Sequence, residues 1–232
     1  MEIPNNYEGL IIEHRHRVFC RVRNLGTGEI TQLPIPQAEK ILGNVFYYDW
    51  FTHDTKFIIN SEKGYEILKL GDQNWRPLQP NFRKDQIVLM SNDRKKMLFF
   101  YCLVHQGSFD LRVTLFDLRT EEYETIRNFP RNIFCDVTKQ IPFYWESDPA
   151  IGELSKENGL RVLVMKNDYS WNEQVIEISS AFLNHHLITM KFFPIDFVNG
   201  ILWFQCNGNR KYYFCYHIVS GSVIGYVKAL FI

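Results

Sequence analysis

The sequence has no excess of charge of either sign. Lys plus Arg and Asp plus Glu both total 26 in 232 residues, so the formal net charge is zero. A dedicated nucleic-acid-binding protein needs a basic surface that displaces counterions from phosphates, and a membrane-surface protein often carries a polybasic segment. Neither class fits this charge balance, so we expect no nucleic-acid partner and no membrane partner.

Long hydrophobic runs and recognisable targeting signals are also missing. No apolar run approaches the roughly 20 residues that span a bilayer, and residues 1–8 do not show a basic segment followed by an apolar one. We therefore expect a cytoplasmic or nuclear protein. Five cysteines form an odd set without a C-x-x-C pair, and reduced thiols without a disulfide or a structural metal are the expected state. They are Cys20, Cys102, Cys135, Cys206 and Cys215.

Aromatic residues, by contrast, are abundant. They make up 16% of the chain, with 19 Phe, 12 Tyr and 5 Trp beside only 13 Gly. Bulky rings suit a pleated, half-buried surface, so this composition favours strands over helices. The length suits a single domain, which we place at residues 1–232.

A repeated pattern runs along the chain. Five segments share an apolar strand, a short polar turn and a second strand, and their turns recur about every 46 to 50 residues, as in kelch-like propeller blades. These segments cover residues 18–33, 65–78, 113–126, 160–178 and 212–227.

Strand pairs of a second kind lie between these segments. Residues 45–48 pair with 56–59, residues 87–90 with 97–104, and residues 188–193 with 200–205. One pair of each kind per period makes about four strands, the content of one propeller blade. We predict an all-β, kelch-like β-propeller of about five four-stranded blades, and an incomplete or open ring is the alternative to a closed one.

Few other elements are predicted. Residues 36–42 and 179–186 are each expected to form one short helical turn, because neither shows sustained helical periodicity. Residues 144–158 are the most polar stretch and carry Pro and Gly. They are predicted to form an exposed loop within a blade.

Several strings resemble the plant F-box-associated domain. The N-L-G-T-G-E-I-T-Q-L-P string at 24–34 is similar to that family's N-P-x-T-G-x-x-x-x-L-P, with Leu25 in place of the usual Pro. The pair L-G at 70–71 and W-R at 75–76 matches another family motif, and F-D-L-R-T-E at 116–121 resembles its F-D-x-R-S-E. Further matches begin at residue 7 and continue in order to 213–217, so the resemblance covers nearly the whole chain.

The resemblance implies a protein-interaction module. In that family the domain recognises the target protein of a ubiquitin ligase, while an N-terminal F-box docks on the Skp adaptor of a cullin ligase. This sequence starts where the associated domain is already under way, so we expect an unidentified target protein as its partner. The Skp adaptor and the cullin ligase are expected as partners only if an F-box is supplied.

Candidate binding residues come from polar connections that contain aromatic residues. Interfaces favour Tyr, Trp and Arg, so Tyr144, Trp145 and Arg210 are the predicted target-binding residues. Trp75 is expected to pack between blades, and the same packing is the default for Trp50. His14 and His16 would share one face of a strand, but no turn is expected to complete a metal site around them.

Catalytic signals are missing. No G-x-S-x-G, H-E-x-x-H, P-loop or G-x-G-x-x-G string occurs, and the acidic residues around 117–124 are interleaved with arginines, as in a solvated hairpin turn. We therefore expect no enzymatic activity and no cofactor. The alternative is a propeller-based enzyme or small-ligand-binding protein, since loops distant in sequence can assemble a site that short motifs do not reveal.

Overall fold

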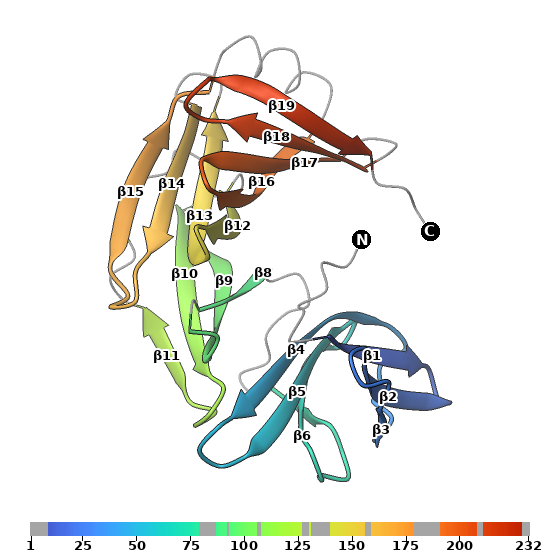
Figure 1. The fold of residues 1–232 in the computed structure, drawn as a ribbon. Helices are drawn as coiled ribbons and strands as arrows, with labels where there is room; N and C mark the ends of the chain where they lie inside the picture. Colours follow the sequence, from blue (N-terminus) through green and yellow to red (C-terminus); the bar gives the residue numbers. More distant parts are fainter. Residues whose placement is uncertain are drawn as a thin grey trace. The chain divides into compact units, whose positions relative to one another are not determined.

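Every regular element in the described part of the chain is a β-strand (Figure 1). The computed structural model describes residues 9–78, 87–91, 93–105, 108–126, 130, 140–155, 159–178, 191–207 and 211–228. The predicted all-β class is therefore confirmed. The backbone divides into two compact units, residues 1–86 and residues 87–232. That the two act as one domain stays a prediction.

The first unit contains two antiparallel sheets whose strands follow one another in sequence order. The three-stranded sheet consists of β1 (Leu10–Arg15), β2 (Phe19–Asn24) and β3 (Ile30–Leu33). The four-stranded sheet consists of β4 (Ile41–Asp49), β5 (Asp54–Ser61), β6 (Gly64–Lys69) and β7 (Arg76–Pro77). In each of these two sheets, turns connect strands that are neighbours both in sequence and in the sheet, so each sheet is a meander.

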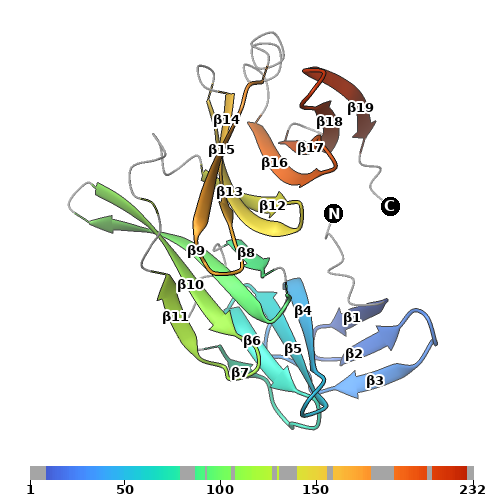
Figure 2. The same ribbon diagram turned by 60° about the vertical axis from the view of Figure 1, so that its left-hand side comes forward.

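The second unit contains a four-stranded sheet and an eight-stranded sheet. The smaller sheet consists of β8 (Ile87–Met90), β9 (Lys96–His105), β10 (Ser108–Asp117) and β11 (Tyr123–Ile126). The larger sheet joins two meanders through a short parallel contact between β12 and β16, which lie side by side in Figure 2. The first of them is β12 (Gln140–Trp145), β13 (Asp148–Ser155), β14 (Gly159–Met165) and β15 (Trp171–Ile176). The second is β16 (Lys191–Val198), β17 (Ile201–Asn207), β18 (Lys211–His217) and β19 (Ser222–Lys228).

The described strands thus form five successive meanders, the repeating construction of a β-propeller. Four of them have four strands, and the first has three among the described residues. The predicted propeller is confirmed, and the finer kelch-like assignment stays a prediction. One predicted strand pair is shifted along the chain: β16 begins its described pairing at Lys191 and continues to Val198, with a bulge between Pro194 and Asp196.

Apolar clusters join successive meanders. In the first unit, Val22 and Leu33 pack with Phe46, Phe57 and Leu68 of the second meander. In the second unit, one cluster joins the third and fourth meanders and another joins the fourth and fifth. A meander therefore obtains much of its core from its neighbour, as the inward faces of stacked blades require.

Strand β14 shows how this packing follows from the sequence. Leu163 and Met165 belong to the cluster shared with the third meander, whereas Val162 and Val164 belong to the cluster shared with the fifth. Because successive side chains of a strand point to opposite faces, a strand covered on both faces must be apolar at nearly every position. The sequence G-L-R-V-L-V-M of β14 meets that requirement.

The predicted exposed loop at residues 144–158 is wrong for its described part. Residues 144–145 end β12, and β13 begins at Asp148 after a turn of two residues, Glu146 and Ser147, which both have positive φ (49° and 73°). The Gly that suggested a loop is a packing residue, because a Cβ at Gly152 would lie 2.9 Å from the Phe143 ring. Polarity is concentrated in the tight turn, and a hairpin needs no more than that.

The two predicted helical turns have different outcomes. Residues 36–42 form no helix, because residues 34–40 are irregular and β4 begins at Ile41. The segment 179–186 lies outside the described residues. No helix of the described chain is long and apolar enough to cross a membrane.

Gly159 offers a test of the close packing at the start of β14. Its φ is +69°, and a Cβ would lie 2.3 Å from the carbonyl oxygen of Ile176. Gly200 has a similar φ of +76° but open space around it. We expect Gly200→Ala to lower the free energy of unfolding by about 1 to 2 kcal/mol from backbone strain alone. Gly159→Ala is expected to cost about 3 kcal/mol or more.

Urea unfolding of the two variants, followed by tryptophan fluorescence, measures this difference. Both glycines lie in the second unit and have a positive φ. Gly200→Ala is therefore a matched control for the free-energy cost of placing an alanine at positive φ. Equal losses in the two variants would mean that the close approach to Ile176 contributes nothing.

Candidate functional site

The structure places two of the three predicted binding residues in a strand. Tyr144 and Trp145 are the last residues of β12, on the first strand of the fourth meander, and each pairs with a residue of β16. Arg210 lies outside the described residues. Their role in target binding stays a prediction, but the surroundings of Tyr144 and Trp145 explain why this strand carries aromatic residues.

Tyr144 connects two meanders of the second unit. Its hydroxyl oxygen accepts a hydrogen bond from the backbone N–H of Met90 at 2.8 Å, and its ring packs against the cluster shared by the third and fourth meanders. Burial raises the pKa of Tyr144 above its usual range. The phenol thus remains protonated at neutral pH and satisfies a backbone donor at the end of β8.

Trp145 packs toward the fifth meander. Its ring stacks on Phe197 with centroids 3.8 Å apart and planes inclined by 25°. Next to it, the backbone N–H of Glu146 donates to the carbonyl of Phe197, and the Glu146 carboxylate accepts from the backbone N–H of Asn199. These contacts tie the β12–β13 turn to the β16–β17 turn, and the indole of Trp145 beside them is half-buried.

Among the described residues, the most exposed aromatic side chains lie elsewhere, in the hairpin that joins β4 to β5. We call residues 48–53 the aromatic tip. Trp50 and Phe51 are 73% and 82% exposed. Tyr48 contacts the Trp50 ring edge-on, with centroids 4.9 Å apart, and its hydroxyl lies 2.6 Å from Nδ1 of His53.

Asp49 holds the aromatic tip in shape. Its side chain accepts the backbone N–H of Phe51 at 2.8 Å, and its carbonyl accepts the N–H of His53 at 2.8 Å. His53 adopts a φ of 58°, which closes the turn. Because the side chain of Asp49 is buried while the next two rings are not, the hairpin presents Trp50 outward from a fixed base.

Sequence reasoning missed this tip. We expected Trp50 to pack, by analogy with Trp75, whereas the structure exposes it. The available signal was two consecutive aromatic residues inside a turn whose other members, Asp49 and 52–54, are polar. Large rings in a hairpin turn have few neighbours to pack against, because the turn projects beyond the sheet.

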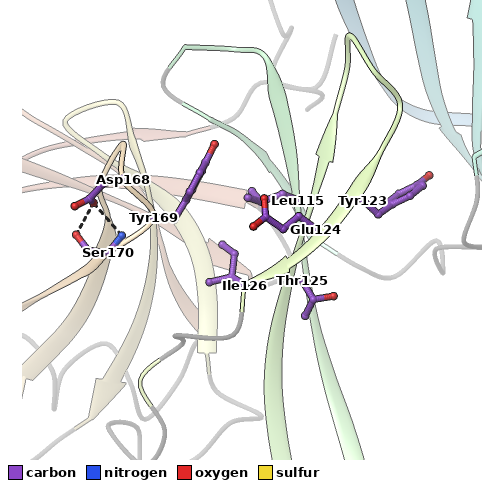
Figure 3. A pocket seen from close by; sticks show the side chains of 8 residues that line it. All are labelled: Leu115, Tyr123, Glu124, Thr125, Ile126, Asp168, Tyr169 and Ser170. Atoms are coloured by element: carbon purple, nitrogen blue, oxygen red, sulfur yellow. Dashed lines mark hydrogen bonds between the residues drawn. The ribbon is translucent and has the colours of Figure 1, made fainter.

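A cleft of about 730 Å³ lies between the third and fourth meanders of the second unit (Figure 3). The turn from Asp168 to Ser170 lies on one side, and Leu115, Glu124 and Ile126 lie on the other. Asp168 accepts bonds from the backbone N–H and the hydroxyl of Ser170, which hold the pKa of its carboxyl below the usual range. This carboxylate therefore stabilises its own turn.

A smaller groove of about 440 Å³ lies in the first unit. Trp75 forms part of its wall and donates its indole N–H to the carbonyl of Pro34 at 2.7 Å. As predicted, Trp75 packs against the cluster shared by the first two meanders. Lys63 lies at the same groove and donates from Nζ to the carbonyl of Gln37 at 3.0 Å.

Glu66 is the unusual member of this groove. Its Oε2 is shielded from solvent and has no hydrogen-bond partner among the described residues. In the β6–β7 register Glu66 pairs with Pro77. Burial raises the pKa of Glu66; the nearby charge of Lys63 lowers it and that of Glu62 raises it. Sequence reasoning did not single out this carboxylate, since its spacing carries no motif.

The arrangement of His14 and His16 gives little support for a metal site. The β1–β2 hairpin brings His14 directly opposite Cys20, which corrects the expectation that no turn would bring them together. Cys20 is fully buried, however, and burial raises its pKa to about 11. His16 lies in the turn, with Nδ1 3.1 Å from the carbonyl of Ala38. In the described part of the chain, no three His, Cys, Asp or Glu side chains are grouped to hold a metal ion.

A serine–histidine contact occurs in the β18–β19 turn. Nδ1 of His217 lies 3.0 Å from the hydroxyl of Ser220 and accepts the backbone N–H of the same residue at 3.2 Å. The Ser220 hydroxyl also lies 2.8 Å from that of Ser222. Because both contacts to Nδ1 come from a residue three positions later, they stabilise an exposed turn.

No family model and no curated protein matches the chain. Among solved structures, it is similar to the β-propeller domain of Cps50 (Swd1) from Myceliophteria thermophila, with 11% identity, a TM-score of 0.47, and coverage of 96% of this chain and 70% of that one. It is also similar to a puromycin-hydrolyzing peptidase of Mycobacterium tuberculosis, with 10% identity, a TM-score of 0.47, and coverage of 88% and 35%.

A third similar structure is the WD40 domain of SCAP from fission yeast, with 12% identity, a TM-score of 0.41, and coverage of 96% of this chain and 59% of that one. This chain therefore spans between 35% and 70% of the length of these three proteins. Similarities this distant assign neither an activity nor a partner to this chain.

The raised pKa of Glu66 predicts a pH-dependent stability difference. The folded state holds the proton of this carboxyl more tightly than the unfolded state, so its contribution is fully present below about pH 4.5, the ordinary value. That contribution is lost as the pH rises through the higher folded-state pKa. Glu66→Gln is therefore expected to raise the melting temperature relative to wild type at pH 7.5, with a smaller difference at pH 4.5.

Differential scanning fluorimetry at several pH values measures the trend. Glu29→Gln, at an exposed turn of the same unit, is the matched control and should show no such trend. A difference between Glu66→Gln and wild type that is constant with pH would contradict the account of a carboxylate that is costly to ionise.

Proposed function

We propose that this chain is a protein-interaction module that holds a target protein, with the aromatic tip as part of its binding surface. The observation that carries the proposal is the exposure of Trp50 and Phe51 on a hairpin anchored by Asp49. Trp is among the residues that contribute most to protein interfaces. Exposed aromatic residues next to each other are costly in water, and a partner surface removes that cost.

The free energy available from burying these two rings against a partner supports the proposal. Full burial of a large apolar side chain contributes about 1.5 to 3 kcal/mol, and aromatic pairs add further when their rings meet a partner ring. The anchored turn also reduces the conformational entropy that is lost on binding, because the backbone around Trp50 is already ordered by the bonds to Asp49.

The resemblance to the plant F-box-associated domain gives this module a place in a larger system. Target binding is the step that this chain contributes, and the target is ubiquitinated when an F-box links the module to the Skp adaptor of a cullin ligase. Support comes from the motif matches that follow in order along the sequence and from the propeller construction. The role is one of binding, without catalysis and without a cofactor.

Affinity capture with paired variants tests the binding role. The double variant Trp50→Ala/Phe51→Ala is compared with wild type and with Val175→Ala/Val219→Ala, in which two other exposed apolar side chains are truncated. A protein captured by wild type is then purified, and its affinity is measured by calorimetry. We expect the tip variant to lose at least about tenfold in affinity, while the valine variant binds as wild type does.

Two results contradict the proposal. One is a purified target that binds the tip variant and wild type equally well, which removes the tip from the surface. The other is native mass spectrometry in which wild type retains a small molecule and no protein, which favours the enzyme or ligand-binding alternative. Circular dichroism of both double variants confirms that the fold is intact.

A further inference from the structure

The smaller groove of the first unit, which Glu66 lines and which we call the Glu66 groove, differs in composition from the aromatic tip. Its lining includes the apolar residues Trp75, Pro77 and Leu78, the acidic residue Glu66, and the polar or basic residues Gln37, Lys63 and Asn74. The volume of about 440 Å³ is within the range of sites that hold a small molecule or a single long side chain. Apolar side chains beside an acidic one suit a ligand that has an apolar stem and a cationic end.

The carboxylate lacks the contacts that usually accompany burial. Buried charged groups are normally paired or hydrogen-bonded, because loss of hydration is costly. Oε2 of Glu66 has no partner among the described residues, and the opposite residue in β7 is Pro77. A cation placed in the groove compensates for this lost hydration.

The charges around the groove leave room for such a cation. Lys63 is the nearest basic residue, but its ammonium donates to the carbonyl of Gln37. Glu62 accepts the backbone N–H groups of Glu39 and Lys40 at 2.6 and 3.0 Å, so its carboxylate is engaged in holding that segment. Both charges act on Glu66 through space, with opposite signs.

We propose that this groove binds a basic side chain, Lys or Arg, of a partner polypeptide, with its aliphatic stem along Trp75 and Leu78 and its charged end at the Glu66 carboxylate. The indole of Trp75 also attracts a cation over its face. The stem replaces water along the apolar walls, which contributes to affinity in proportion to the buried area. The proposal stands apart from the aromatic tip, so either one can fail alone.

Titration with paired probes tests the groove in the full chain. The probes are N-acetyl-lysine methylamide and its neutral counterpart N-acetyl-norleucine methylamide, and n-butylammonium separates a free amine from a peptide-borne one. Binding is followed by the NMR shift of the Trp75 indole N–H and the Leu78 methyl groups. We expect saturable shifts with the lysine probe, weaker binding of n-butylammonium, and none with norleucine.

The variants then assign the interaction to Glu66. Glu66→Gln keeps the shape of the side chain and removes its charge, and it should weaken binding of the lysine probe by about tenfold. Glu29→Gln should leave binding unchanged. Wild type supplies a second readout without a substitution, because binding of the lysine probe should fall as the pH is lowered through the pKa of Glu66.

Each contrary outcome overturns the proposal. Equal binding of lysine and norleucine probes means that the groove recognises only apolar surface. Equal binding to wild type and Glu66→Gln means that the carboxylate takes no part. Binding of n-butylammonium as tight as that of the lysine probe points to a free amine instead of a polypeptide side chain. Shifts that do not saturate at tens of millimolar mean that no site exists.

Discussion

Apolar packing between the faces of neighbouring meanders holds each unit of this protein together. In the second unit, Leu98 and Val113 of the third meander share a cluster with Ile151 and Leu163 of the fourth. The opposite face of the fourth meander packs on Phe204 and other residues of the fifth. A single meander cannot bury both faces, and each fully buried Leu or Phe contributes about 1.5 to 3 kcal/mol. The order of the blades along the chain therefore determines which side chains must be apolar.

This constraint separates structural from functional aromatic residues. Tyr144 and Trp145 sit where successive meanders meet, and their rings serve that contact. Trp50 and Phe51 sit in the turn between β4 and β5 and are exposed. Glu66 of β6 is an intermediate case, because its Oε2 is shielded from solvent and has no hydrogen-bond partner among the described residues. The groups available for recognition are therefore those that the packing between meanders does not use.

Much of the fold could be predicted from the sequence, because a hairpin appears there as polar turn residues between two apolar strands. The turn at 24–28, between β2 and β3, and the turn at 117–122, between β10 and β11, were both located from polar residues between apolar strands. Strand β13 could not be found in this way. The ring of Phe143 leaves no room for a Cβ at Gly152, and Glu153 is buried despite its charge. Contacts with neighbouring strands explain both residues, and the pattern of residues along one strand does not reveal such contacts.

The candidate sites were harder to predict for the same reason. The exposure of Trp50 depends on what lies beside the β4–β5 hairpin in space, and the burial of Oε2 of Glu66 depends on the residues that pack around β6. A resemblance between short motifs could suggest a binding function. It could not say which aromatic residues are committed to packing, since Trp75 and Trp50 look alike in sequence and differ in the structure.

Hydrogen exchange in a core variant tests most directly whether the meanders depend on one another. Leu98→Ala removes a fully buried side chain from β9 in the third meander and should cost about 2 to 5 kcal/mol. If the shared cluster stabilises both meanders, amide protection will fall in β14 of the fourth meander as well as in β9 and β10. Protection that falls only in β8–β11, with β14 at the wild-type level, would contradict the account.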